Sequence, residues 1–144
     1  MVQVYFANHQ TKIRLNPNRI QRTLRKILKK ERVTHAHLSV VFVTDQKIKS
    51  LNKKFLKKNR PTDVLAFDLR EPSQKSRKVM NGEIIISTDT AKRNASIFKT
   101  TIENELTLYV IHGILHLLGF DDHAPRAMNQ MRAKEQEMLR QLTK

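Results

Sequence analysis

The chain has 144 residues, of which 39% are hydrophobic, and it contains no cysteine; 28 lysines and arginines against 13 aspartates and glutamates give a net charge of +15 at pH 7. This length suits a single domain, residues 1–144, with a substantial core. Disulfides and thiolate zinc sites are excluded, and the lack of an 18-residue uncharged run excludes a transmembrane span.

The excess of positive charge favours a polyanionic partner. Nucleic acid is the first expectation and an anionic membrane surface the second, while a basic protein without such a partner is the alternative. The first eight residues lack the basic head, long apolar run and cleavage site of a secretory signal. Together with the absence of cysteine, this predicts a cytoplasmic protein.

The first part of the chain predicts strands alternating with helices. Apolar alternation predicts a strand over residues 2–6, and Pro17 begins a helix with one apolar face and one strongly basic face. That basic face is either solvated or directed at RNA. A continuous apolar run predicts a buried strand over 37–44, and Asp45 is expected to cap a short helix that reaches Phe55.

The middle of the chain predicts two further strands, over residues 64–67 and 83–87. Between them, residues 70–80 lack an apolar period and predict an exposed loop, and the dipeptide at 81–82, Asn-Gly, predicts a turn.

The last third predicts three helices. Thr88 or Asp89 is expected to cap the first, which runs through Phe98, a capping box at residues 100–103 opens the second, and Pro125 opens the last. The fold class expected from these elements is α+β: a mostly mixed four-stranded sheet packed with about five helices.

Two histidines lie on the second of these helices. His112 and His116 are four residues apart and therefore share one helical face. The surrounding residues, 106–118, are apolar nearly all the way round, which predicts that the helix is buried. Because a buried imidazole without a partner is strongly destabilising, a metal ion shared by both rings is expected, and this spacing suits it.

The residues after this helix offer a third metal ligand. Gly119 supplies a left-handed stop that lets the chain fold back beneath the histidines, followed by Asp121, Asp122 and His123. Asp122 and His123 are both chemically suitable as the third ligand. The alternative for Asp121 and Asp122 is that they only place negative charge near the N-terminus of the last helix. Three protein ligands would leave an open position for catalysis, and a fourth would make the metal structural.

Gly113 stands where H-E-x-x-H metalloproteases carry their general-base glutamate. This difference speaks against a peptidase.

Four motifs occur along the chain in one order: Leu51-Asn52-x-x-Phe55, Pro61-Thr62-Asp63-Val64-Leu65-x-Phe67, Gly82-Glu83-Ile84-x-Ile86-Ser87 and His112-Gly-x-Leu-His116-Leu-x-Gly119-Phe-Asp121. In order and spacing they closely resemble the YbeY family of bacterial endoribonucleases that mature ribosomal RNA. The resemblance covers essentially the whole chain.

The resemblance implies a cytoplasmic, zinc-dependent, single-strand-specific endoribonuclease with one Zn²⁺ per chain. It implies action in 16S rRNA 3′-end maturation and ribosome quality control, with the 16S rRNA precursor of the small ribosomal subunit as partner and no membrane. His112 and His116 match the first two zinc ligands. The family usually has histidine where this chain has Asp122, so either Asp122 replaces that ligand or an inserted residue makes His123 the ligand. The ungapped register of the last helix favours Asp122.

A second departure from the family lies at Leu56, where an arginine that faces the substrate phosphate is usual. Lys57, Lys58 or Arg60 is expected to replace it as a phosphate stabiliser. Two other functions are consistent with the residues: a different metal-dependent hydrolase, including a peptidase, and a non-catalytic ribosome-associated RNA-binding protein with a structural metal. The sequence leaves the oligomeric state open.

Overall fold

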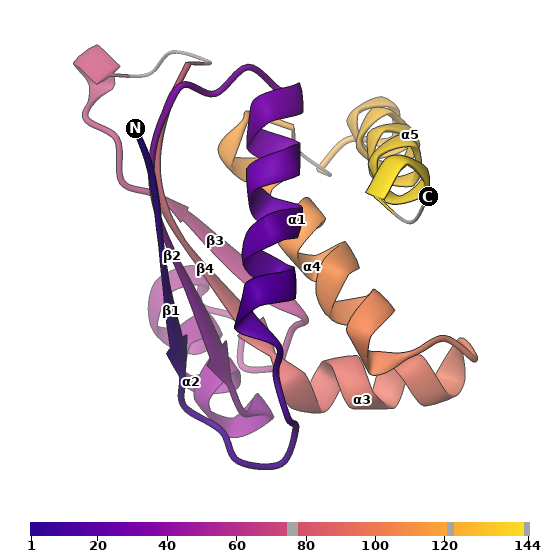
Figure 1. The fold of residues 1–144 in the computed structure, drawn as a ribbon. Coiled ribbons are helices and arrows are strands. Elements are labelled where there is room, and N and C mark those ends of the chain that lie inside the picture. Colours follow the sequence, from indigo (N-terminus) through magenta and orange to yellow (C-terminus); the bar gives the residue numbers. More distant parts are fainter. Residues whose placement is uncertain (75–77, 121–122, 143–144) are drawn as a thin grey trace.

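A four-stranded mixed sheet organises the described part of the chain (Figure 1). The computed structural model describes residues 1–74, 78–120 and 123–142, and only the backbone of Gln74. The strands lie in the order β1-β2-β4-β3 and are β1 (Val2–Asn8), β2 (His35–Val43), β4 (Val79–Ser87) and β3 (Val64–Asp68). The first three pair in parallel, and β3 pairs with β4 in the antiparallel direction at the edge. The predicted α+β fold with a mixed sheet is therefore confirmed.

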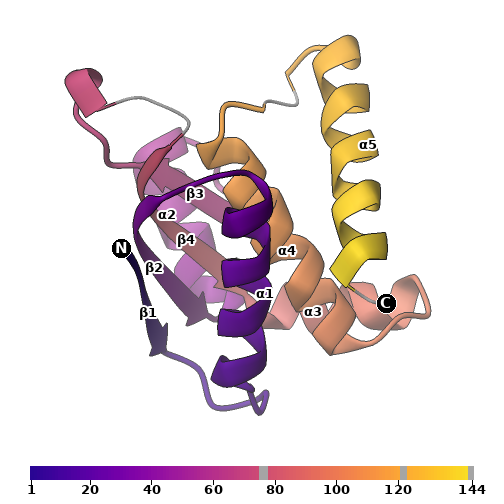
Figure 2. The same ribbon diagram turned by 45° about the horizontal axis from the view of Figure 1, so that its top comes forward.

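Within the described residues, five α-helices surround this sheet: α1 (Pro17–Lys30), α2 (Asp45–Leu56), α3 (Thr88–Ile97), α4 (Ile102–Leu117) and α5 (Pro125–Leu142). A short 3₁₀ turn covers Pro72–Gln74. Helices α1 and α4 cover one face of the sheet and α2 covers the other, while α5 packs on α4 on the side away from β1 (Figures 1 and 2). Within the described ranges, no helix has the length and hydropathy needed to cross a bilayer.

The two faces of the sheet bury two separate apolar clusters. Because strand side chains alternate, Ile84 and Ile86 of β4 join the large cluster beneath α1 and α4, whereas Ile85 points to α2. The large cluster also takes in Met131 of α5. The small cluster under α2 contains Val43, Ile48, Leu65 and Ile85. The sheet therefore separates α2 from α4.

The predicted turn at Asn81 and Gly82 is wrong, because both residues lie inside β4 and pair with β2. Gly82 is needed for a close approach: a Cβ atom there would lie 2.7 Å from Cδ1 of Leu117 and 3.0 Å from the carbonyl oxygen of Phe67. The predicted loop over 70–80 contains the 3₁₀ turn and the first two residues of β4. Its residues 75–77 lie outside the described part.

In three helices the N-cap is a neighbour of the expected residue or residues. The caps are Thr44 for α2, Ser87 for α3 and Thr101 for α4, and each hydroxyl oxygen accepts from a backbone N–H three residues later. At each helix start, the hydroxyl accepts from a backbone N–H of the first turn that has no partner within the helix. The neighbouring polar side chain that was expected as the cap is then available for other contacts. The expected extent of α3 through Phe98 is also corrected, since the helix ends at Ile97 and Phe98 is its C-cap, 64% exposed.

Asp45, the expected cap, instead joins the beginnings of α2 and α3. Its carboxylate accepts hydrogen bonds from the hydroxyls of Ser87 (2.6 Å) and Thr90 (2.7 Å) and forms an ion pair with Arg93. Burial alone would raise the pKa of Asp45, but the hydrogen bonds from Arg93, Ser87 and Thr90 outweigh it, and the pKa lies below its ordinary value.

Candidate functional site

Helix α4 lies directly against the sheet at Gly113. A Cβ atom at this position would lie 2.8 Å from Cγ2 of Ile84, which is fully buried in β4. Gly113 therefore faces the sheet, and the contact leaves no room for a glutamate side chain there. The position that carries the general base in H-E-x-x-H metalloproteases belongs to the core of this protein.

His112 and His116 lie on a less covered face of the same helix. Both are half-buried, and 25% of the His112 side chain is exposed, so the expectation of fully buried imidazoles is corrected to partial burial. Their Nε2 atoms are 3.1 Å apart, and their rings meet at 71° with centroids separated by 4.7 Å. The two ring nitrogens thus point at one place.

Two imidazole nitrogens at this distance repel each other unless a proton or a cation lies between their lone pairs. Two nitrogens that bind one tetrahedral ion at about 2.05 Å are separated by about 3.3 Å. The observed separation is close to this value. The histidine pair therefore has the donor type and the spacing for a shared metal ion of the zinc class.

Glu135 of α5 orients the first of these rings. One of its carboxylate oxygens contacts Nδ1 of His112, and its side chain is only 12% exposed. A carboxylate accepts hydrogen bonds, so Nδ1 carries the proton and the lone pair of Nε2 is directed toward His116. Carboxylates hold metal-binding histidines in this way, because the hydrogen bond fixes the ring and raises its basicity.

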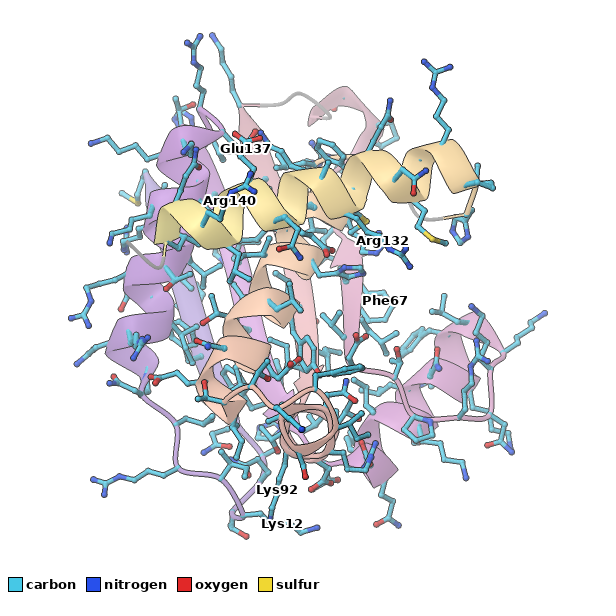
Figure 3. All side chains as sticks on the ribbon, turned by 90° about the vertical axis from the view of Figure 1, so that its right-hand side faces the viewer. Lys12, Phe67, Lys92, Arg132, Glu137 and Arg140 are labelled. Atoms are coloured by element: carbon cyan, nitrogen blue, oxygen red, sulfur yellow. The ribbon has the colours of Figure 1, made fainter. Side chains whose placement is uncertain are left out.

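A small pocket of about 140 Å³ opens beside His112, lined by His112, Met128, Met131, Arg132 and Glu135. The four residues from α5 have the spacing i, i+3, i+4 and i+7, so they form one face of that helix. Arg132 leaves α5 on the opposite edge from Glu137, on the side where Phe67 lies (Figure 3). The pocket therefore brings the guanidinium of Arg132 close to His112.

The structure leaves the third ligand a prediction. Asp121 and Asp122 lie outside the described residues. His123 is exposed and precedes α5. Over residues 1–74, 78–120 and 123–142, no three side chains among His, Asp and Glu are grouped so as to hold a metal ion.

The three cations proposed as phosphate stabilisers lie after α2. Lys57, Lys58 and Arg60 are all exposed. The side-chain amide of the buried Asn52 donates to the carbonyl oxygen of Arg60 at 2.9 Å, which holds this loop against α2. Among the described residues that line the pocket at His112, none of the three is present. Their role stays a prediction.

Sequence reasoning missed both Glu135 and Arg132. The position of Glu135 was a detectable signal, because it lies four residues after Met131 and three before Met138, on the inner face of α5. An acidic residue in an apolar stripe needs a partner. Which residue on another helix provides it depends on the packing of α5 against α4.

Known proteins resemble this chain over most of its length. The family model described as Endoribonuclease YbeY matches residues 5–143. The chain is 34% identical to the Endoribonuclease YbeY of Syntrophus aciditrophicus over 139 residues, which cover 94% of this chain and 87% of that protein. It is also 34% identical to the Endoribonuclease YbeY of Cytophaga hutchinsonii over 137 residues, covering 94% and 93% of the two chains.

A solved structure shares the fold as well. The solution structure of the Thermotoga maritima protein TM1509 is similar with a TM-score of 0.69 and 33% sequence identity, covering 97% of this chain and 89% of that one. The match thus extends over the sheet, the histidine-bearing helix and α5. The resemblance seen in the sequence motifs is confirmed, and the chain belongs to the YbeY endoribonuclease family.

Proposed function

We propose that this protein is a zinc-dependent endoribonuclease that cleaves single-stranded RNA, with one zinc ion per chain held by His112 and His116. In the cell it acts in the cytoplasm on the 3′ end of the 16S rRNA precursor in the small ribosomal subunit and contributes to ribosome quality control. The observation that carries the proposal is the convergence of two Nε2 atoms, 3.1 Å apart, beside a pocket that contains an arginine. The net charge of +15 supports a polyanionic substrate.

The protein side chains have distinct roles in this proposal. Glu135 keeps the proton of His112 on Nδ1, so that Nε2 of His112 is available to bind the ion. Asp122 is the favoured third ligand and His123 the alternative. Bound zinc would polarise a phosphoryl oxygen or lower the pKa of a water molecule.

In this proposal Arg132 holds the scissile phosphate. It lines the pocket together with His112 and Glu135, and a guanidinium can donate two parallel hydrogen bonds to phosphate oxygens. Lys57, Lys58 and Arg60 bind the flanking phosphates. A phosphoryl transition state gathers negative charge on its oxygens, so these cations would stabilise it more than the ground state.

The test is cleavage of an end-labelled single-stranded RNA that carries the 16S 3′ precursor sequence, with a matched duplex for comparison. Zinc-loaded wild-type protein is expected to cut the single strand, and His116→Ala is expected to abolish cutting and lower the zinc content measured by elemental analysis. His37→Ala is the matched control, because His37 is an exposed histidine on β2. Intact RNA with the wild-type protein, while a control nuclease cuts it, would refute the proposal.

A chelator experiment separates this function from an RNA-binding protein with a structural metal. If the ion is catalytic, chelation should abolish cleavage while the protein stays folded. A thermal melt followed by far-UV circular dichroism would then still show a cooperative unfolding transition. Unfolding on chelation would favour a structural ion. A peptidase is disfavoured by the packing of Gly113 on Ile84, and peptide turnover that disappears in His116→Ala would revive it.

A further inference from the structure

A large aromatic side chain is exposed at the end of α2. Phe55 is 54% exposed, and its ring meets the ring of Phe67 from the edge strand β3 at a centroid distance of 5.4 Å and an angle of 64°. This edge-to-face contact supports Phe55 from beneath. Leu56, the next residue, is 50% exposed. Two adjacent large apolar side chains are therefore exposed at the end of α2.

The surroundings of Phe55 are positively charged. Residues 46–62 contain seven lysines and arginines and no aspartate or glutamate. The five cations closest to Phe55 in the sequence are all exposed: Lys53, Lys54, Lys57, Lys58 and Arg60. The Nζ atom of Lys54 lies 5.2 Å from the centroid of the Phe55 ring. An apolar ring within such a group of cations suits a ligand that combines flat apolar rings with negative charges.

Hydrogen bonds tie the basic loop after α2 to the end of that helix. Lys57 ends the helix with a left-handed backbone, φ 57°, and its N–H donates to the carbonyl oxygen of Lys53 at 3.1 Å. Asn52 binds the loop twice: its carbonyl oxygen accepts from the N–H of Lys58 at 3.3 Å, and its amide donates to Arg60. Since this order exists before a ligand binds, association loses less conformational entropy.

The aromatic pair lies at the same level of the sheet as the histidine pair. Gly113 of α4 contacts Ile84 of β4, and Ile84 pairs with Ala66 of β3, the residue before Phe67. Phe67 points to the α2 face and α4 covers the other face, so the edge strand β3 separates the two sites. Figure 3 shows Phe67 in this intermediate position, between Arg132 of α5 and helix α2. An extended strand that crosses this edge would contact both.

We propose that Phe55, supported by Phe67, stacks on a base of single-stranded RNA while the surrounding lysines and Arg60 contact the adjacent phosphates. The inference rests on the proposed function, because it takes RNA as the substrate. An unpaired base exposes the flat face that stacking requires, whereas a duplex covers it. The aromatic platform, defined as Phe55 with Phe67, therefore selects single strands at a position beside the catalytic site.

Tryptophan fluorescence tests stacking directly, because the chain contains no tryptophan. Phe55→Trp introduces the only indole, and a base stacked on it is expected to quench its emission. Phe98→Trp is the matched control, since Phe98 is a 64% exposed phenylalanine beside Lys99 at the end of α3. Both are titrated in a His116→Ala background, which prevents cleavage, with a single-stranded RNA, its duplex and an abasic strand of equal charge.

Quenching of Phe55→Trp by the single strand alone supports the platform, and equal quenching of Phe98→Trp would overturn it. In anisotropy titrations with the same labelled single strand, Phe55→Ala is expected to weaken binding about 5- to 150-fold, the effect of one stacked base. Phe98→Ala is expected to bind as the parent does, and Phe55→Tyr to retain affinity.

Unchanged affinity in Phe55→Ala would overturn the platform and leave the cleavage proposal intact. If wild-type protein did not bind single-stranded RNA, both proposals would fail. Loss of self-association in Phe55→Ala during sedimentation, with RNA binding unchanged, would assign the patch to a second copy of the chain and overturn the stacking proposal.

Discussion

Replacing Gly113 by alanine should destabilise the protein, although the same change stabilises most helices. The added Cβ atom would lie 2.8 Å from Cγ2 and 3.2 Å from Cγ1 and Cδ1 of Ile84, whereas carbon atoms prefer about 3.5–4.0 Å. Ile84 is fully buried and β-branched, so its Cγ2 methyl cannot turn away. Helix α4 and strand β4 would have to separate.

Two opposing free-energy terms set the size of this loss of stability. Overpacking a core by one methyl group costs about 1–3 kcal/mol. Alanine in place of glycine inside a helix contributes about 1 kcal/mol of stability. The free energy of unfolding should therefore fall by about 1 kcal/mol in urea titrations followed by circular dichroism. Ala133→Gly on the exposed side of α5 measures the propensity term in this protein, and it should lower stability by about 1 kcal/mol.

A double-mutant cycle isolates the contact. Ile84→Ala removes the obstructing methyl groups and costs about 2–5 kcal/mol by itself. In that background Gly113→Ala should be stabilising by about 1 kcal/mol, because only the propensity term remains. The reasoning is refuted if Gly113→Ala stabilises the wild-type background to the same extent.

Three further predictions concern the candidate site and the acid stability of the fold. Glu135→Gln should weaken zinc binding about 10- to 100-fold in chelator competition, while Glu137→Gln, an exposed change on the same helix, should leave it unaltered. Arg132→Ala should lower the cleavage rate about 100-fold, with Arg126→Ala as the exposed control on α5; equal effects of the two would contradict a phosphate contact. The pKa of Asp45 is lowered in the fold, so its carboxylate stabilises fully above the unfolded pKa of about 3.9 and loses this effect as the pH falls below that value. Asp45→Asn should accordingly be less stable than wild type at pH 7, and urea titrations should show the difference shrinking below about pH 4.

The sequence was sufficient for the fold class, because apolar spacing or a continuous apolar run marks each strand and helix over most of its length. Val40 and Phe42 of β2 are buried as the continuous apolar run predicted, and Gly119 has the left-handed φ of 101° expected after α4. These features are determined by residues that are close together in the sequence, so a local pattern is enough to predict them.

The errors arose where tertiary contacts decide between local alternatives. Asn81 and Gly82 form a common turn dipeptide, yet the packing of Leu117 on β4 requires a glycine inside the strand. Glu135 belongs to the apolar stripe of α5 and binds a histidine on another helix, a pairing that no local pattern discloses. The third ligand, Asp122 or His123, stays a prediction for the same reason: it depends on how the chain returns after Gly119.

The contact between Glu135 and His112 also makes α5 part of the catalytic machinery proposed here. Glu135 lies on α5 and His112 on α4. If α5 separates from α4, His112 therefore loses the carboxylate that fixes its ring. Docking of the C-terminal helix and affinity for the metal are then thermodynamically linked, each strengthening the other by the same free energy. Metal binding would thus strengthen the packing of α5 on α4, and the stability of this packing would depend on whether the metal is bound.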